Sequence, residues 1–411
     1  MSDMTEKRKK LIILGIPIII FIFLFISNHF HSKLPGEPPF KNKITFPLSW
    51  EKNFEHKITP YWDISQYGEI VCSNNSSKVY FINPLNGKTK KEILLSEDSS
   101  NMILKFNNNQ IYGVVNNKDI YSINTEEKKV VKEIKNDKRI LIFLNGQNII
   151  VYKNNLIFWQ DNGKVIVLNT KTGRKIKKRL FFSEVVEDVK VYNNMIYSSK
   201  NGFNIYAFEM KTLEEIWKYD IGHTHTGSKP VIIGEKMYLK VENDKRKILV
   251  FNPHNGDILN KYNIYVSFIF SDGKDLYGNG KEYVYKIDSD TGEIIWKYKE
   301  KAYEILFSNK YVYFQSSTKP VFYKLNKLTG NKVWKIDLFD ITLNIKKVIS
   351  TKKYDILERE DGAIFVLDKN TGEKLWKFKK TVDCDKQNWT VYNGILIISD
   401  GANKIYGYKL R

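Results

Sequence analysis

The stretch TGEIIWKYKE at residues 291–300 decides the fold, because two close copies of it follow. These copies are TGNKVWKIDL at 329–338 and TGEKLWKFKK at 371–380. Each places a Trp four residues after a Gly, and the successive Trp residues lie 38 and 42 residues apart. A fixed period of about 40 residues is typical of propeller blades and solenoid turns. The sequence therefore predicts a chain built from structural repeats.

More copies are found when the apolar run before the Gly is included, as in VYKIDSDTGEIIWKY (284–298). Successive copies are spaced by 36–45 residues. The positions equivalent to the Gly are Gly87, Lys128, Gly173, Leu213, Gly256, Gly292, Gly330 and Gly372. A ninth copy, IYGYKLR (405–411), stops where its turn would begin, so the series ends in the middle of a unit.

Each unit has the local signals of short strands and tight turns. Runs such as VYKID (284–288) are rich in β-branched and aromatic residues, which favour strands. Asp or Asn then begins a turn, and Gly supplies the positive φ that such a hairpin needs. Two further apolar runs precede each hairpin, and no convincing helix follows residue 30. Four antiparallel strands per 40 residues predict an all-β propeller; the competing β-sandwich would not repeat so strictly.

The truncated last copy predicts how the ring closes. Trp50, in TFPLSWEKNF (45–54), lies 41 residues before Lys91, the Trp-equivalent position of the first copy. The strand at 46–54 is therefore expected to pair with the strand at 403–410. Counting hairpins predicts nine blades of four strands, with eight as the alternative. Residues 46–411 then form one monomeric ring.

Four tryptophans occupy the same position in their repeats: Trp217, Trp296, Trp334 and Trp376. A ligand-stacking aromatic would not normally be copied into successive repeats. We therefore expect these rings to fill the spaces between blades.

The N-terminus has the features of a membrane anchor. Residues 11–27 are 17 uncharged, mostly apolar residues, a helix of about 25 Å, and the predicted anchor helix spans residues 11–30. Basic residues before it predict a cytoplasmic tail at 1–10 and an extracytoplasmic propeller, reached through a linker at 31–45. A cleaved signal peptide is the alternative, but no small-residue cleavage site follows. The expected location is the cell membrane, with a single span.

The formal net charge of the chain is +20, and residues 1–10 contribute only +2 of it. A basic body beside a membrane favours anionic surface polymers, anionic headgroups or acidic proteins as partners. Nucleic acid is disfavoured by the predicted side of the membrane. The lysines are scattered rather than clustered, so base composition of the coding sequence is an alternative cause.

The segments IDSDTGEIIWKY (287–298), LNKLTGNKVWKI (325–336) and LDKNTGEKLWKF (367–378) resemble the PQQ-like repeat, (Leu/Ile)-Asp-x-x-Thr-Gly-x-x-x-Trp. The resemblance covers residues 46–411 and implies a quinoprotein alcohol dehydrogenase-like propeller. Proteins with this repeat are either quinone-dependent alcohol dehydrogenases or non-catalytic propellers such as the BamB-type assembly lipoprotein. This chain lacks the lipidation Cys of the latter.

The dehydrogenases with this repeat resemble one another in a Cys-Cys pair, a Ca²⁺ site and a catalytic Asp. Here the two cysteines, Cys72 and Cys384, are far apart, and no acidic run has Ca²⁺-loop spacing. His223 and His225 in GHTHTGS (222–228) are two nitrogens without a third ligand nearby. We therefore expect no catalytic, cofactor-binding or metal-binding residues and no enzyme activity. The alternative is an enzyme or a small-ligand or cofactor binder that uses the central funnel.

The function expected is a protein-binding scaffold of the cell envelope, with variable loops on a rigid ring as its binding surface. These loops include SNNSSK, GHTHTGSK, ENDKRK, LFDITLNIKK and DCDKQN. Charge reversal of Lys245, Arg246 and Lys247 is expected to weaken partner capture without unfolding the ring. Because closure makes the first and last repeats neighbours, a disulfide between Cys72 and Cys384 is a further hypothesis.

Overall fold

The computed structural model describes most of the chain after residue 41. The described residues are 42–59, 61–97, 102–107, 109–135, 140, 149–159, 164–172, 174–179, 189–200, 204–220, 230–241, 247–338, 343–378 and 388–410. They belong to one compact unit, Asn42–Arg411. The predicted tail, the anchor helix at 11–30 and most of the linker lie outside the described residues.

Each repeat forms four strands, which we name inner, second, third and outer by their order from the centre of the ring. The inner strands are β2 (Asp63–Ile64), β6 (Met102–Asn107), β10 (Ile149–Tyr152), β14 (Val189–Tyr192), β18 (Val231–Ile233), β22 (Phe268–Ser271), β26 (Ala302–Phe307), β30 (Ile345–Ser350) and β34 (Trp389–Tyr392). The second strands are β3 (Ile70–Ser73), β7 (Gln110–Val115), β11 (Asn155–Trp159), β15 (Met195–Lys200), β19 (Lys236–Val241), β23 (Leu276–Asn279), β27 (Tyr311–Ser316), β31 (Tyr354–Arg359) and β35 (Ile395–Ser399). The third strands are β4 (Lys78–Ile82), β8 (Asp119–Asn124), β12 (Lys164–Asn169), β16 (Asn204–Glu209), β20 (Lys247–Phe251), β24 (Tyr283–Ile287), β28 (Val321–Asn326), β32 (Ile364–Asp368) and β36 (Lys404–Lys409). The outer strands are β5 (Thr89–Leu94), β9 (Lys129–Ile134), β13 (Lys175–Arg179), β17 (Glu215–Asp220), β21 (Ile258–Tyr262), β25 (Ile294–Lys299), β29 (Lys332–Asp337), β33 (Lys374–Phe378) and β1 (Leu48–Asn53).

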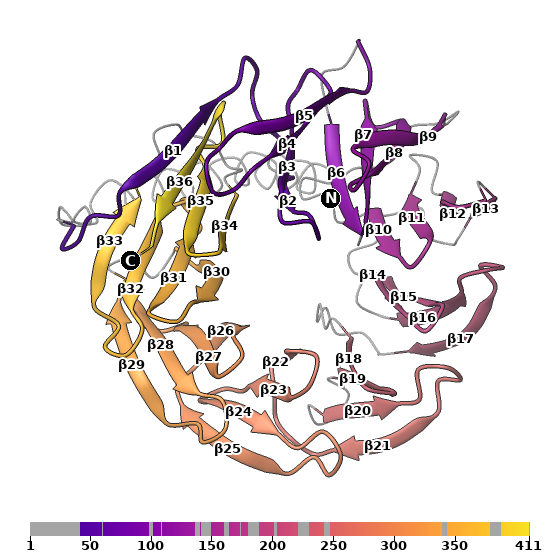
Figure 1. Ribbon diagram of the computed structural model, residues 1–411. Coiled ribbons are helices and arrows are strands. Elements are labelled where there is room, and N and C mark those ends of the chain that lie inside the picture. The colour runs from indigo at the N-terminus through magenta and orange to yellow at the C-terminus, as the bar shows by residue number, and fades with distance from the viewer. Residues whose placement is uncertain are drawn as a thin grey trace, which may run out of the picture. The chain divides into compact units, whose positions relative to one another are not determined.

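In the described part of the chain these strands form nine four-stranded antiparallel sheets. Blades 1 to 8 are each built from four consecutive strands, beginning with β2–β5 and ending with β30–β33. Blade 9 combines β34, β35 and β36 with β1. The blades follow one another around a circle, with the inner strands nearest its centre (Figure 1). The structure thus confirms an all-β propeller and favours nine blades over eight.

Among the described residues the core consists of nine apolar clusters, and each cluster lies between two neighbouring blades. Blade 1 shares one cluster with blade 9, through Ile70 and Ile397, and another with blade 2, through Val71 and Ile111. Successive residues of a strand point to opposite faces of its sheet, so each blade supplies both clusters. Because blade 9 also shares a cluster with blade 8, the circle of clusters is closed.

Ring closure joins the two ends of the described chain. Strand β1 pairs antiparallel with β36, with Glu51 opposite Tyr406. The Lys404 Nζ lies 2.8 Å from the Glu51 Oε1 across this pair. The predicted pairing of the strand at 46–54 with the strand at 403–410 is confirmed.

The residues just before β1 also contact the ring. The backbone N–H of Lys43 donates to the carbonyl oxygen of Leu375 in β33 at 2.9 Å, and the side chain of Asn42 accepts from the N–H of Lys377 at 3.0 Å. Phe46 is buried, and its ring centre lies 5.6 Å from that of Trp376. Residues 42–53 therefore contact the outer edges of both blade 8 and blade 9, and they connect the two blades.

The repeated Gly and Trp contact each other across blades rather than within one repeat. Trp296 in blade 6 donates from its Nε1 to the carbonyl oxygen of Lys327 in blade 7 at 3.1 Å. Its ring lies against Gly330, where a Cβ would come within 2.7 Å of it. The equivalent pairs are Trp50–Gly87, Trp217–Gly256, Tyr262–Gly292 and Trp334–Gly372. The prediction that these rings fill the spaces between blades is confirmed, and the contact explains why the motif requires a Gly.

The turn before each outer strand has the predicted chemistry. In blade 6 the Asp288 Oδ1 accepts from the backbone N–H groups of Asp290 and Thr291 at 2.9 and 2.8 Å. Gly292 then adopts a φ of 79°. In the two copies without Gly, Lys128 and Leu213 adopt φ values of 50° and 59°, so the turn is the same despite a Cβ.

Eight of the nine outer strands have a register shift next to the Trp position, which marks a β-bulge. In blade 6, Trp296 lies opposite Lys286 and Ile294 opposite Ile287, so Ile295 is the extra residue. Bulges on an edge strand hinder pairing with a second chain. The outer edges of the blades are therefore poorly suited to strand addition.

Candidate functional site

The ring has two faces that differ in their connections. Inner strands begin on one face, which also carries the loops between second and third strands, and we call it the loop face. The inner strands end on the other face. That face carries the turns between inner and second strands and the turns between third and outer strands. We call it the turn face.

The described inner strands carry mainly apolar, aromatic and basic side chains. Their lysines are Lys105, Lys190, Lys346 and Lys347. Within these strands the carboxylates are Asp63 and Glu304, and there is no His. An enzyme or cofactor site in the central funnel was expected to bring acidic or His side chains from several blades. The carboxylates of the described inner strands come from two blades, blade 1 and blade 7.

Three exposed aromatic side chains lie on the loop face of blades 6 and 7. Phe268 begins β22, Tyr303 is the second residue of β26, and Tyr265 lies just before β22. Their exposed fractions are 42%, 59% and 46%. Single exposed apolar residues are ordinary, but grouped aromatics mark interaction sites. We call these three residues the aromatic rim.

One buried side chain holds the two halves of the aromatic rim together. Asn279, at the end of β23, is fully buried between blades 6 and 7. Its Oδ1 accepts from the backbone N–H of Phe268 at 2.9 Å. Its Nδ2 donates to the carbonyl oxygens of Ala302 and Tyr303 at 2.8 and 3.0 Å. The backbone at both strand starts is therefore held in place, which lowers the backbone entropy lost when a partner binds.

Glu300 anchors the connection that precedes Tyr303. Its Oε2 accepts from the Tyr323 hydroxyl at 2.7 Å and lies 2.6 Å from the Lys319 Nζ. Its Oε1 accepts from the Ser316 hydroxyl at 2.9 Å. Burial acts to raise the pKa of Glu300, but these three donors outweigh it and lower the pKa below its ordinary value. The connection is thus tied to the neighbouring loop of blade 7.

This network predicts a pH-dependent contribution to stability. A carboxylate with a lowered folded pKa stabilises the fold above its unfolded pKa of about 4.3, and this stabilisation is lost as the pH falls through the folded value. We expect Glu300→Gln to lower the melting temperature at pH 7 and to have a smaller effect at pH 3. Glu282→Gln, at an exposed site in the adjacent loop, is the control. Equal effects of Glu300→Gln at both pH values would contradict this assignment.

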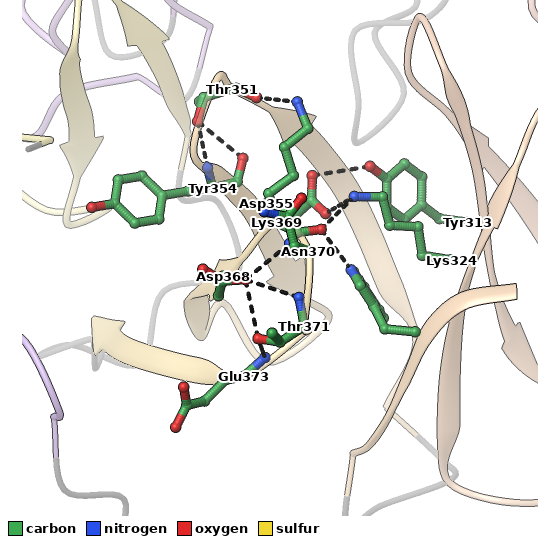
Figure 2. A network of polar contacts seen from close by, with 11 residues as sticks. Tyr313, Lys324, Thr351, Tyr354, Asp355, Asp368, Lys369, Asn370, Thr371 and Glu373 are labelled. Atoms are coloured by element: carbon green, nitrogen blue, oxygen red, sulfur yellow. Dashed lines mark hydrogen bonds and ion pairs between the residues drawn. The ribbon is translucent and has the colours of Figure 1, made fainter.

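A second polar network lies on the turn-face side, between blades 7 and 8 (Figure 2). The side chains of Lys324 and Asp355 are both fully buried, and the Lys324 Nζ lies 2.6 Å from the Asp355 Oδ2. The Tyr313 hydroxyl donates to the other carboxylate oxygen at 3.0 Å. The Lys324 Nζ also donates to the carbonyl oxygen of Lys369 at 2.8 Å and lies 3.8 Å from the ring centre of Tyr311. Because both ions are covered, this network joins the blades and does not form a ligand site.

The predicted disulfide between Cys72 and Cys384 is not formed. Cys72 carries a free thiol, buried in the cluster between blades 9 and 1. It lies within β3, opposite Tyr80, and its side chain faces the core rather than a loop. Burial raises the pKa of this thiol. Cys384 lies outside the described residues.

Most of the variable loops expected to bind partners lie wholly or partly outside the described residues. The same is true of His223, His225, Lys245 and Arg246, while Lys247 is the first residue of β20.

The loop SNNSSK (73–78) is described, and it is a compact turn. Asn74 is fully buried, and its Oδ1 accepts from the backbone N–H groups of Ser76 and Lys78. Asn75 is exposed and Ser76 is half-buried, so part of the loop reaches the surface, and a binding role for it stays a prediction.

The aromatic rim was not identified from the sequence. The segments YVSFIF (265–270) and KAYEILF (301–307) carry more aromatic residues at the start of an inner strand than an alternating core pattern requires. This excess of aromatic residues was the signal in the sequence that could have identified the aromatic rim.

The described residues hold neither a candidate metal site nor a candidate membrane-spanning helix. No group of three or more His, Cys, Asp or Glu side chains there could hold a metal ion. No helix in that part of the chain is both long and apolar enough to span a membrane.

The family model described as outer membrane protein assembly factor BamB matches residues 143–276 and 280–411. These two segments cover more than half of the chain. The chain belongs to this family of PQQ-like repeat propellers. The aromatic rim of this BamB-family propeller draws on both matched segments, since Tyr265 and Phe268 lie in the first and Tyr303 in the second.

Two solved structures share the fold of this BamB-family chain. The crystal structure of the computationally designed Ika8 protein matches with a TM-score of 0.53 and 12% identity, covering 88% of this chain and 99% of the other. BamB from Moraxella catarrhalis matches with a TM-score of 0.51 and 10% identity, covering 89% and 100%. At such identities the likeness shows the fold alone. A comparison with curated protein sequences gives no match.

Proposed function

We propose that this protein is a membrane-anchored assembly scaffold of the cell envelope that binds other envelope proteins through its aromatic rim. In this proposal residues 11–30 anchor the chain, residues 1–10 stay in the cytoplasm and the propeller lies outside. The basic residues before the apolar segment support this orientation. Membership of the BamB family supports a role in assembly rather than catalysis.

The observation that carries the proposal is the aromatic rim. Tyr265, Phe268 and Tyr303 remain exposed although each could bury a large apolar surface. Tyrosine and other aromatic residues are enriched where protein interfaces concentrate their binding energy. The backbone that carries Phe268 and Tyr303 is held in place by Asn279, which contacts both strand starts. An exposed aromatic surface on a backbone held in place suits the docking of a folded or extended protein segment.

Catalysis in the funnel is the second candidate, and the described inner strands do not favour it. Their two carboxylates lie on β2 and β26, in blades 1 and 7. General acid and base chemistry usually pairs groups within hydrogen-bond reach of one substrate. We therefore place the binding function first.

The proposal predicts which substitutions remove partner capture. We expect Phe268→Ser with Tyr303→Ser to lower the amount of partner co-purified from native membranes about tenfold or more, because two interface anchors are lost. Ile294→Ser with Ile295→Ser is the matched control, since these residues of β25 are 44% and 51% exposed on the outer strand. Both variants should melt like the unchanged protein. Undiminished capture by the rim variant would overturn the proposal.

A further inference from the structure

The mouth of the ring on the turn face is formed by the turns between inner and second strands. Direct contacts join some of these turns from blade to blade. The Asn107 Nδ2 donates to the carbonyl oxygen of Lys153 at 2.7 Å, and the Lys153 Nζ lies 3.4 Å from the Asn194 Oδ1. Between blades 9 and 1, the Tyr392 hydroxyl occupies the place of a Cβ at Gly68. Neighbouring turns therefore lie side by side around the mouth.

These turns carry exposed lysines, and their carboxylates are largely neutralised. The exposed lysines are Lys153 in blade 3, Lys274 in blade 6, Lys310 in blade 7, and Lys352 and Lys353 in blade 8. We call these five residues the lysine annulus. Of the carboxylates in the described turns of this type, Glu69 is buried and paired with Lys90 and Lys128, while Asp272 and Asp275 pair with Lys327 and Lys286. In those turns only Glu235 is an exposed carboxylate.

We propose that the lysine annulus is a second binding site, which takes a linear phosphate-bearing polyanion at the mouth of the ring. Ammonium groups bind phosphate as point charges, and several of them around one opening raise the local concentration of an anion. Exposed Asn side chains in the same kind of turn add neutral donors for phosphate oxygens: Asn154, Asn193, Asn194, Asn309 and Asn393. This site goes beyond the proposed function, because it lies at the opposite end of the inner strands from the aromatic rim.

A thin chain fits this surface better than an anionic membrane does. The turns between third and outer strands lie farther from the centre on the same face, and they carry exposed carboxylates. These are Glu126, Glu127, Glu214, Asp257, Asp290, Glu293 and Glu373, and they outnumber the exposed basic residues of the described turns of this type, which are Lys88, Lys171, Arg174 and Lys211. A flat anionic surface would meet these carboxylates together with the lysines. A narrow polymer that reaches the mouth would meet mainly the lysine annulus.

The test uses the full-length protein in detergent and fluorescently labelled linear polyphosphate as the probe. We expect binding that weakens steeply with added salt, because phosphate contacts release counterions. Lys310→Glu, Lys352→Glu and Lys353→Glu together should weaken binding at least tenfold. The matched control reverses three exposed lysines of outer strands, Lys91→Glu, Lys261→Glu and Lys335→Glu, and should change binding less than about twofold.

Two outcomes would overturn the inference. The first is an equal loss of polyphosphate binding in both triple variants, which would mean that net charge alone attracts the probe. The second is stronger annulus-dependent binding to phosphatidylglycerol vesicles or to polyglutamate than to polyphosphate. Vesicle binding would assign the surface to the membrane, and polyglutamate binding would assign it to an acidic protein.

Discussion

Deleting residues 404–410 is expected to abolish the cooperative thermal unfolding of the ring. The deletion removes β36, which pairs with β1 on one side and β35 on the other. It also removes Ile405 from the cluster between blades 9 and 1, and Tyr406 and Tyr408 from the contacts of the cluster between blades 8 and 9. The strand β1 then has no partner, and two of the nine blade interfaces lose core at once. We expect a broad, non-cooperative transition in circular dichroism.

The controls separate closure from a general effect of truncation. Arg411 comes after Leu410 and lies beyond the end of β36. Deleting Arg411 alone should therefore leave the transition unchanged. Gly407→Ala should lower the melting temperature while leaving the strand in place, because the new Cβ would overlap the Trp50 ring. A deletion variant that melts as sharply and at the same temperature as the full chain would contradict closure by β1 and β36.

The second large effect is expected at the buried ion pair between blades 7 and 8. Lys324→Met leaves the Asp355 carboxylate buried without its cation, and we expect a loss of about 3–5 kcal/mol in the free energy of unfolding. Lys324→Met with Asp355→Leu should recover much of this loss, because no uncompensated charge then remains. Chemical denaturation of the unchanged protein, the two single variants Lys324→Met and Asp355→Leu, and the double variant measures the difference. A double variant as unstable as the sum of the two single changes would contradict this view of the pair.

Blade 6 offers a matched control for this prediction. Lys286 occupies in β24 the position that Lys324 has in β28, and its Nζ lies 3.0 Å from the Asp275 Oδ2. The Asp275 side chain is 26% exposed, whereas Asp355 is fully covered. Water can hydrate Asp275 after Lys286→Met, so we expect a clearly smaller loss of stability.

The fold could be predicted from the sequence because the repeated positions have one physical task each. Gly292 and its equivalents supply a positive φ and leave room for an aromatic ring. Each blade needs one such position, so the spacing of these residues indicates the length and number of the blades. Trp50 was identified by the same spacing, which also predicted closure. Lys128 and Leu213 keep the turn without Gly, and their copies were still found from the strand pattern around them.

The surfaces could not be predicted in the same way. Exposure of Tyr303 depends on where β26 begins relative to blade 6, and the contact there is made by Asn279, which is distant in sequence. The lysine annulus is formed by turns about 40 residues apart, so in the sequence its lysines look scattered. The placement of Cys72 depended on the register of its strand. A shift of one residue along a strand moves a side chain to the opposite face of the sheet.

The most direct test of a docking scaffold is photo-crosslinking from the aromatic rim in native membranes. A photoreactive amino acid replaces Tyr303 in the full-length protein, and in a second variant it replaces Lys335, which is exposed on the outer strand β29. We predict a discrete covalent adduct with another envelope protein from position 303 and none from position 335. Adducts from position 335 with none from position 303 would contradict the proposal that this ring docks its partners at the aromatic rim.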